Sequence, residues 1–358
     1  MNPRHSEIIE LIRKEVKPAL GCTEPIAVAL AAAKAVEILE ERSNVSMRND
    51  KDLRIDVQVS ANILKNGMGV GIPGTGMVGL FIAAALGAVC GKSSYGLEVL
   101  QDFDEVSINK AKELVSKKYV RINLAETNKK LYIKAMVESA QIPGHQATAV
   151  IEDDHDNIAE IWYDNSLLAS SHRETAEEPQ KCTLDYGLTV KEIFDFAQSV
   201  PYEDIEFVLE SRSLNLTLAE EGLRGKYGLR VGWAISLESS KEVFGDDFLS
   251  YAMSMTAAAS DARMAGCTLP AMSNSGSGNQ GITATMPIIA YSQKYPVSEE
   301  KLARALTMSH LIAIHIKGYL GKLSALCGCV IASTGAACGL IYLRGGSYEQ
   351  MCYSIKNM

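Results

Sequence analysis

The first residue in this sequence that could do chemistry is Cys22, which lies in a turn between two predicted helices. Thr23, as the N-cap, and Pro25, in the first turn, start the second of these helices. Free N–H groups and the helix dipole at such a position stabilise a thiolate, which can bind a metal or remove a proton. Most cysteines are instead small buried apolar residues, so position alone leaves both interpretations open.

Two glycine-rich regions are suited to holding a small anion. In the first, an Asn/Lys run at 62–67 is followed by a glycine turn at 71–76 that leads into an Ala/Gly-rich helix, whose first amides can hold a carboxylate or phosphate. The second, at 273–281, has many donors and little to pack. A turn without a ligand and an exposed linker are the alternatives. The candidate binding residues are Asn62, Lys65, Asn66, Gly74, Thr75, Gly76, Ser273, Asn274, Ser275, Gly276, Ser277, Gly278, Asn279 and Gln280.

A helix predicted to begin at Ser298 carries two titratable residues on one face. His310 and Lys317 are seven residues apart and therefore lie nearly one above the other, whereas His315 points elsewhere. A histidine on a helix is more often a satisfied core residue than a catalyst. If the face is buried, however, these side chains are costly there without a purpose, so both are candidate catalytic residues.

The same helix leads into Cys327-Gly328-Cys329. Residues two apart on a helix diverge by about 200°, so at most one of these thiols faces a shared site unless Gly328 breaks the helix. The sequence contains no C-x-x-C pair, which argues against a structural zinc site.

Composition excludes several classes of protein. The formal net charge of −8 and the scattered basic residues argue against nucleic acid or an anionic membrane as partner. The N-terminus has no apolar signal core, and eight cysteines in 358 residues predict reduced thiols in the cytoplasm. Residues 323–343 are uncharged and long enough to span a membrane, but their small residues favour a buried helix.

The elements that must position these residues predict an α+β fold, with a helical body formed by both ends of the chain and an inserted sheet-plus-helices domain. We expect helices from Ser6 to Leu20 and from Thr23 to Arg42. Strands are predicted from the alternation of apolar residues at 53–59 and at 119–124, 131–137, 147–151 and 158–163. The predicted boundaries are N-terminal helices of the helical catalytic domain at 1–45, the sheet domain at 46–170, a linker at 171–188 and the helical catalytic domain at 189–358. The last helical pattern stops at Met358 without a cap, which predicts an incomplete C-terminus.

Several of these segments, taken in order, resemble the L-cysteine desulfidase family, which is related to the iron–sulfur L-serine dehydratase alpha chain. The resemblance spans nearly the whole chain, and the matching segments are Glu15–Pro25, Asn62–Gly67, Pro73–Gly76, Ser273–Gly281, Ser309–Leu311 and Leu323–Cys327. It implies a carbon–sulfur or carbon–oxygen lyase that converts L-cysteine to pyruvate, ammonia and sulfide, or L-serine to pyruvate and ammonia. A small amino acid is then the substrate, and a homodimer is expected.

The resemblance also implies a 4Fe-4S cluster held by three cysteines, with one iron open to substrate. Cys327 matches one ligand, with Cys329 as the substitute. The other two ligands lie in a C-D-G-A-K-x-x-C segment that is expected beyond Met358. Cys22 matches the position of the proton-abstracting base, and His310 is the second candidate for that role.

Two other functions remain open from the sequence. The loop at 275–281 also looks like the asparagine loop of pyridoxal-phosphate dehydratases, in which Lys241 is the plausible Schiff-base lysine. The alternating strands and helices of those enzymes are absent from the pattern around it. A non-catalytic amino-acid-binding protein is the other alternative.

Overall fold

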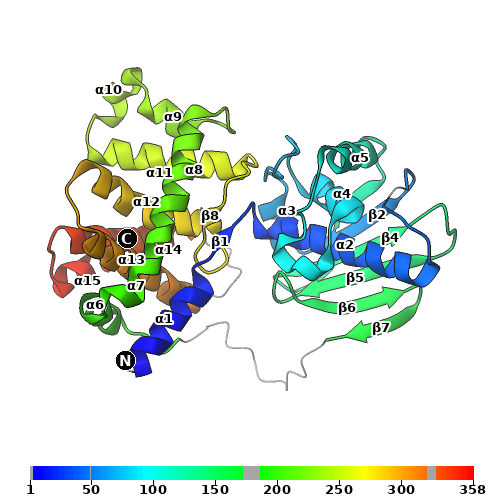
Figure 1. The fold of residues 1–358 in the computed structure, drawn as a ribbon, viewed down its shortest axis with the longest axis horizontal. Coiled ribbons are helices and arrows are strands. Elements are labelled where there is room, and N and C mark those ends of the chain that lie inside the picture. The colour runs from blue at the N-terminus through cyan, green and yellow to red at the C-terminus, as the bar shows by residue number, and fades with distance from the viewer. Residues whose placement is uncertain (1–2, 49, 172–185, 321–327) are drawn as a thin grey trace. The chain divides into compact units, whose positions relative to one another are not determined.

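The computed structural model describes residues 3–48, 50–171, 186–320 and 328–358, and the chain divides into two compact units (Figure 1). Unit 1 comprises residues 1–20 and 180–358, and unit 2 comprises residues 21–179. Helices dominate unit 1, and unit 2 combines a sheet with helices. The predicted α+β class is confirmed.

Unit 1 is built around one apolar core to which its N-terminal helix and its C-terminal helices all contribute. Its long helices α12, α13 and α14 pack on one another. Its elements are α1 (Pro3–Glu15), β1 (Pro18–Ala19), α6 (Val190–Ser199), α7 (Tyr202–Ile205), η2 (Glu206–Leu209), α8 (Glu210–Arg224), α9 (Val231–Ser236), η3 (Glu238–Ser240), α10 (Lys241–Phe244), α11 (Phe248–Met264), β8 (Ala271–Met272), α12 (Gly278–Lys294), α13 (Glu299–Leu320), α14 (Gly328–Leu343) and α15 (Tyr348–Asn357).

Unit 2 contains a six-stranded sheet in the order β3-β2-β4-β5-β6-β7. The β2–β3 pair is parallel and the other pairs are antiparallel. Figure 1 shows α2 and α4 on one face of this sheet. The elements are α2 (Thr23–Ser43), β2 (Arg54–Val59), α3 (Ala61–Gly67), α4 (Leu80–Cys90), η1 (Ser93–Glu98), α5 (Glu105–Ser116), β3 (Val120–Leu124), β4 (Tyr132–Glu138), β5 (Gln146–Glu152), β6 (Ile158–Tyr163) and β7 (Ser166–Ser170).

The first helix differs from its predicted bounds. It runs over Pro3–Glu15, so Ser6 lies inside it and does not cap it. Pro18 lacks an N–H and disfavours helical backbone in the residue before it, which prevents the helix from reaching Leu20. The chain extends instead, and Pro18 and Ala19 pair with β8.

The second helix belongs with the sheet and not with the helical body, so the division at residue 45 differs from the one in the structure. α2 packs on α4 and on strands β4 and β5. Nearly all of its residues from Pro25 to Leu39 are buried, because its alanine-rich surface is covered on several sides. Its N-cap is Cys22 rather than Thr23.

The five predicted strands of the sheet are present, and β7 is an additional one at the edge. Its sequence, Ser-Leu-Leu-Ala-Ser, lacks a clear alternation and most of its residues are exposed. At the other end of the chain, the uncharged segment at 323–343 overlaps α14, whose buried residues face α12 and α13. Within the described ranges, no helix is long and apolar enough to cross a membrane.

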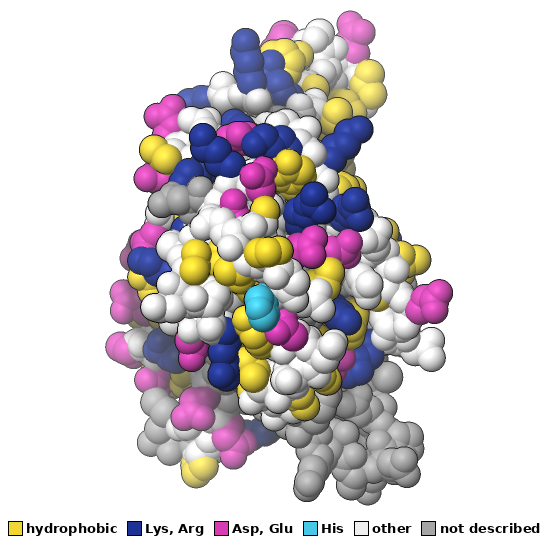
Figure 2. All heavy atoms as spheres, turned by 90° about the vertical axis from the view of Figure 1, so that its right-hand side faces the viewer, with side chains coloured by type: hydrophobic (Ala, Val, Ile, Leu, Met, Phe, Trp, Pro, Cys, Tyr) yellow, Lys and Arg dark blue, Asp and Glu magenta, His cyan; other side chains and the backbone are white. Residues whose placement is uncertain are grey.

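Charged side chains of both signs are interspersed on the face of the molecule drawn in Figure 2. Lysine and arginine side chains there alternate with aspartate and glutamate, and no extended patch of one sign appears on that face.

The contact between α2 and α4 depends on a glycine. A Cβ on Gly87 would lie 2.2 Å from the carbonyl oxygen of Ala29, so the two backbones pack directly against each other. We expect Gly87→Ala to lower the free energy of unfolding by about 1–3 kcal/mol, because the helices must separate to admit the methyl group. Gly69→Ala is the control, since nothing lies within 4 Å of its Cβ position. Equal denaturation midpoints for the two variants would contradict this packing.

Candidate functional site

In unit 2 the structure brings together Cys22 and part of the first predicted binding region. Cys22 precedes α2 with extended backbone, and a Cβ on Gly21 would lie 3.4 Å from the ring of Pro73, so the two turns lie close together. In the first turn of α2, Glu24 Oε1 accepts a hydrogen bond of 3.1 Å from Asn66 Nδ2. Glu24 was not among the predicted site residues, although it follows Cys22 closely in the sequence.

The Asn62, Lys65 and Asn66 side chains all come from the short helix α3. The side chain of Asn66 donates a hydrogen bond to Glu24 of α2, whereas Asn62 is half-buried and Lys65 is exposed. Of the three, Asn66 is therefore tied most directly to the start of α2.

The glycine turn at 71–79 has a tightly defined backbone. Gly74 and Gly76 both have positive φ, at 74° and 67°, which explains the choice of glycine. Thr75 is buried, and its hydroxyl donates to the carbonyl of Ile72 at 2.8 Å and accepts from the N–H of Met77 at 3.0 Å. The Thr75 side chain thus holds the turn itself in shape.

In unit 1, the second predicted binding region is a turn between β8 and α12. The N-terminal segment holds it, because the backbone N–H of Ser273 donates to the carbonyl of Lys17 and that of Ser275 to the carbonyl of Glu15. Ser273 Oγ also donates to Lys17 at 2.6 Å. Ser277 is the N-cap of α12 and accepts from the N–H of Gln280. We call residues 273–280 the Asn274 loop.

Asn274 is fully buried, and its carboxamide joins the loop to α13. Its Nδ2 lies 3.2 Å from the carbonyl oxygen of His310 and 3.1 Å from His310 Nδ1. Its Oδ1 accepts from Ser275 Oγ at 3.0 Å and from Gln280 Nε2 at 2.7 Å. One amide therefore satisfies four hydrogen bonds in the interior.

His310 is fully buried with both ring nitrogens in hydrogen bonds. Nδ1 faces Asn274, and Nε2 lies 3.1 Å from Ser211 Oγ on α8. Burial lowers its pKa from 6.5 to about 4, so the ring is neutral near pH 7. Within the described structure, these contacts give His310 a role in holding the Asn274 loop.

Arg263 is a buried charged residue beside the loop that the sequence did not reveal. It lies on α11 with 4% of its surface exposed, and its Nη1 donates to Asn279 Oδ1 at 3.1 Å. A Cβ on Gly278 would come within 2.2 Å of its Nε, so the guanidinium lies directly against the start of α12. In the sequence, Arg263 is an arginine among alanines and other small residues. This pattern does not indicate which residues its side chain contacts.

The remaining predicted residues lie around α13 and α14. Lys317 is half-buried on the same helix as His310, and Cys329 is exposed in the first turn of α14. Cys327 lies outside the described residues. Among those described, no three His, Cys, Asp or Glu side chains are close enough together to hold a metal ion.

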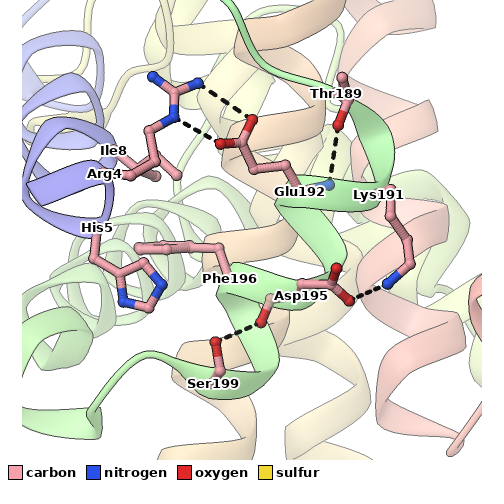
Figure 3. Close-up of a pocket in the computed structure, with 9 residues that line it drawn as sticks. All are labelled: Arg4, His5, Ile8, Thr189, Lys191, Glu192, Asp195, Phe196 and Ser199. Carbon is pink, nitrogen blue, oxygen red and sulfur yellow. Dashed lines mark hydrogen bonds and ion pairs between the residues drawn. The ribbon is translucent and has the colours of Figure 1, made fainter. Parts of the chain in front are cut away.

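A cavity of about 400 Å³ lies between α1 and α6, away from all the predicted site residues (Figure 3). The charged groups that line it are paired with one another. Arg4 Nε donates to Glu192 Oε1 at 2.6 Å, and Lys191 pairs with Asp195. Because these charges neutralise one another, the Asn274 loop and the Cys22 region remain the candidate sites.

Comparison with known proteins agrees with an enzyme-like assignment. A family model described as the serine dehydratase alpha chain matches residues 94–358, which include the Asn274 loop and His310. A UPF0597 protein of Phocaeicola vulgatus is 47% identical over 363 residues, covering 99% of this chain and 80% of its own length. UPF0597 proteins of Oleidesulfovibrio alaskensis and Aeromonas hydrophila are 45% and 42% identical, over 100% of this chain and 81% and 79% of their own lengths.

An α+β protein with this sequence match falls in the class of lyase-type enzymes of amino-acid catabolism. In particular, the chain belongs to the serine dehydratase alpha chain family.

The buried neutral ring of His310 predicts a pH dependence of stability. Below pH 6.5 the unfolded chain takes up a proton on this histidine, whereas the folded chain does so only near pH 4. Stability from this group is therefore fully present above pH 6.5 and is lost as the pH falls toward 4. We expect wild type to lose about 2 kcal/mol more than His310→Gln between pH 7 and 5 in denaturant titrations.

Gln293→Met, at an exposed side chain that does not titrate, is the control and should keep the wild-type pH dependence. If wild type and His310→Gln gave parallel stability curves, the neutral buried ring would be refuted. Ring ¹⁵N shifts of wild type provide a second measurement that needs no variant, with Nε2 protonated and Nδ1 unprotonated.

Proposed function

We propose that this protein catalyses β-elimination from L-cysteine or L-serine, giving pyruvate and ammonia with release of sulfide or water. The observation that carries the proposal is that the region matched by the serine dehydratase alpha chain contains the Asn274 loop, a buried polar turn held rigidly by α13 and by the N-terminal segment. Such preorganised polar groups suit the binding of a small zwitterion.

In this proposal, the loop and Arg263 hold the amino acid. Arg263 brings positive charge to the start of α12, where backbone N–H groups also favour an anion, so this end suits the carboxylate. A fixed carboxylate orients the Cα–H bond for removal of its proton. His310 acts through Asn274 as a positioning residue and not as the base, since its ring is buried and hydrogen-bonded at both nitrogens.

For the base we propose Cys22, because Glu15–Pro25 resembles the segment that carries the proton-abstracting cysteine of the L-cysteine desulfidase family. Cys22 is the N-cap of α2, a 21-residue helix, and the helix dipole favours a thiolate at such a position. In the reaction a base takes the α-proton, the Cα–H electrons form the Cα=Cβ bond, and the sulfide or hydroxide leaves with the Cβ–heteroatom pair and acquires a proton. The aminoacrylate becomes an imine, and water hydrolyses it to pyruvate and ammonium.

Serine dehydratase alpha chains are generally linked to iron–sulfur clusters, and we include a 4Fe-4S cluster in the proposal. Of its two candidate ligands, Cys329 is exposed on α14 and Cys327 lies outside the described residues. The described residues do not complete a set of three ligands. No step of the reaction above is therefore derived through the cluster.

The pyridoxal-phosphate alternative is disfavoured by the environment of Lys241. Its ammonium binds Glu238 Oε2 at 2.7 Å and Asp246 Oδ2 at 2.9 Å, and these hydrogen bonds raise its pKa. A lysine that forms a Schiff base must lose its proton, and two carboxylates oppose this.

The direct test is to assay anaerobically purified protein with L-serine and L-cysteine for pyruvate, ammonia and, with L-cysteine, sulfide. We expect pyruvate and ammonia in equal amounts from at least one substrate, and the ratio of kcat/KM values identifies the preferred leaving group. Tight binding of both amino acids without any pyruvate would favour a binding protein and contradict the proposal.

Cys22→Ser tests the base. A serine hydroxyl is a far weaker acid than a thiol, so we expect kcat to fall by about 10²–10⁴ while KM changes little. Cys90→Ser is the control in the same unit, because the thiol of Cys90 donates to the carbonyl of Leu86 and a hydroxyl can do the same. Equal kcat for Cys22→Ser and wild type would remove Cys22 from this role.

A further inference from the structure

The hydrogen bonds around His310 fix which atom of each group is the donor. A backbone carbonyl can only accept, so the atom of Asn274 that lies beside the carbonyl of His310 must be its amide nitrogen. That nitrogen also donates to His310 Nδ1, which leaves the ring proton on Nε2, directed at Ser211 Oγ. Oδ1 of Asn274 is then directed toward Gln280.

The same reasoning fixes Gln280. Its Nε2 donates to Asn274 Oδ1 at 2.7 Å, and its Oε1 points away from Asn274 as an acceptor. Only 1% of Gln280 is exposed, and in the described structure Oε1 has no hydrogen-bond partner. An unpaired buried acceptor is destabilising and unusual, and Asn274 holds the other end of this carboxamide in place.

The other polar side chains of the Asn274 loop form hydrogen bonds within the protein that stabilise the loop. Ser273 and Ser275 donate to Lys17 and Asn274, Ser277 caps α12, and Asn279 accepts from Arg263. Beside Gln280 Oε1 lies Gly328, the first residue of α14, and a Cβ there would lie 3.1 Å from this oxygen. The glycine keeps the space next to the acceptor clear of a side chain.

We propose that Gln280 Oε1 accepts a hydrogen bond from the α-ammonium group of the substrate and thereby selects amino acids over the corresponding hydroxy acids. This inference rests on the proposed function for the identity of the ligand. An acceptor without a donor of its own attracts a cationic N–H strongly, a neutral hydroxyl less so, and a carboxylate not at all. The ammonium therefore lies at Gln280, and the carboxylate lies toward Arg263.

L-Alanine and L-lactate are the appropriate probes, because they differ only in the amine and neither has a leaving group on Cβ. Their dissociation constants are measured by calorimetry on the whole protein. We expect wild type to prefer L-alanine, and Gln280→Met, which keeps the length of the side chain without the acceptor, to reduce that preference by tenfold or more. Gln293→Met, exposed on the same helix, is the control and keeps the wild-type preference.

Gly328→Ala is a second variant in case Gln280→Met does not fold. Its methyl group crowds Oε1 without removing it, and we expect weaker binding of L-alanine with little change for L-lactate. An unchanged alanine-to-lactate ratio in Gln280→Met would overturn the inference, as would a wild-type protein that binds neither probe.

The outcomes also separate this inference from the proposed function. A protein that forms pyruvate but keeps its preference for L-alanine in Gln280→Met retains the proposed function and loses the role of Gln280. A protein that binds L-alanine through Gln280 but forms no pyruvate retains the role of Gln280 and loses the lyase reaction.

Discussion

The contact between Asn274 and His310 is the constraint on which the rest of the candidate site depends. A primary amide has one acceptor end and one donor end. When it is buried, no water can satisfy an end that faces the wrong partner. Once the carbonyl of His310 fixes the nitrogen of Asn274, the protonation of the His310 ring and the orientation of Gln280 follow. A single backbone carbonyl thus determines which side-chain atoms donate and which accept hydrogen bonds on α8, α12 and α13.

This chain of neutral groups also explains why burial of His310 is tolerated. Charging the ring would place a cation in the core and replace the acceptor at Nδ1 with a donor, which would face the amide nitrogen of Asn274. Desolvation lowers the pKa of His310 and keeps the neutral form. The loop therefore keeps the same shape over the pH range in which an ordinary histidine changes its charge.

Periodicity predicted the sheet well, because each strand has apolar residues on one face and the period of two is local. The glycine and asparagine runs also marked the two turns that the structure shows to be tightly held. The partners of His310 were beyond the sequence, since Ser211 is 99 residues away and nothing near Ser211 indicates a polar contact. The sequence did not reveal that α2 belongs to unit 2, for a related reason. An alanine-rich helix with buried residues on several sides does not indicate which neighbour it packs on.

Spacing on a helix predicted that His310 and Lys317 share one face, but not that His310 is fully buried or that both of its nitrogens are in hydrogen bonds. The difference matters because a base needs a free lone pair directed at substrate, whereas a positioning residue needs both nitrogens bound. Residue types alone made His310 the second candidate for the base, and its two hydrogen-bonded nitrogens favour a positioning role in our proposal. The less conspicuous Gln280, whose Oε1 is buried and unpaired among the described residues, is the atom through which that region recognises a ligand in our proposal.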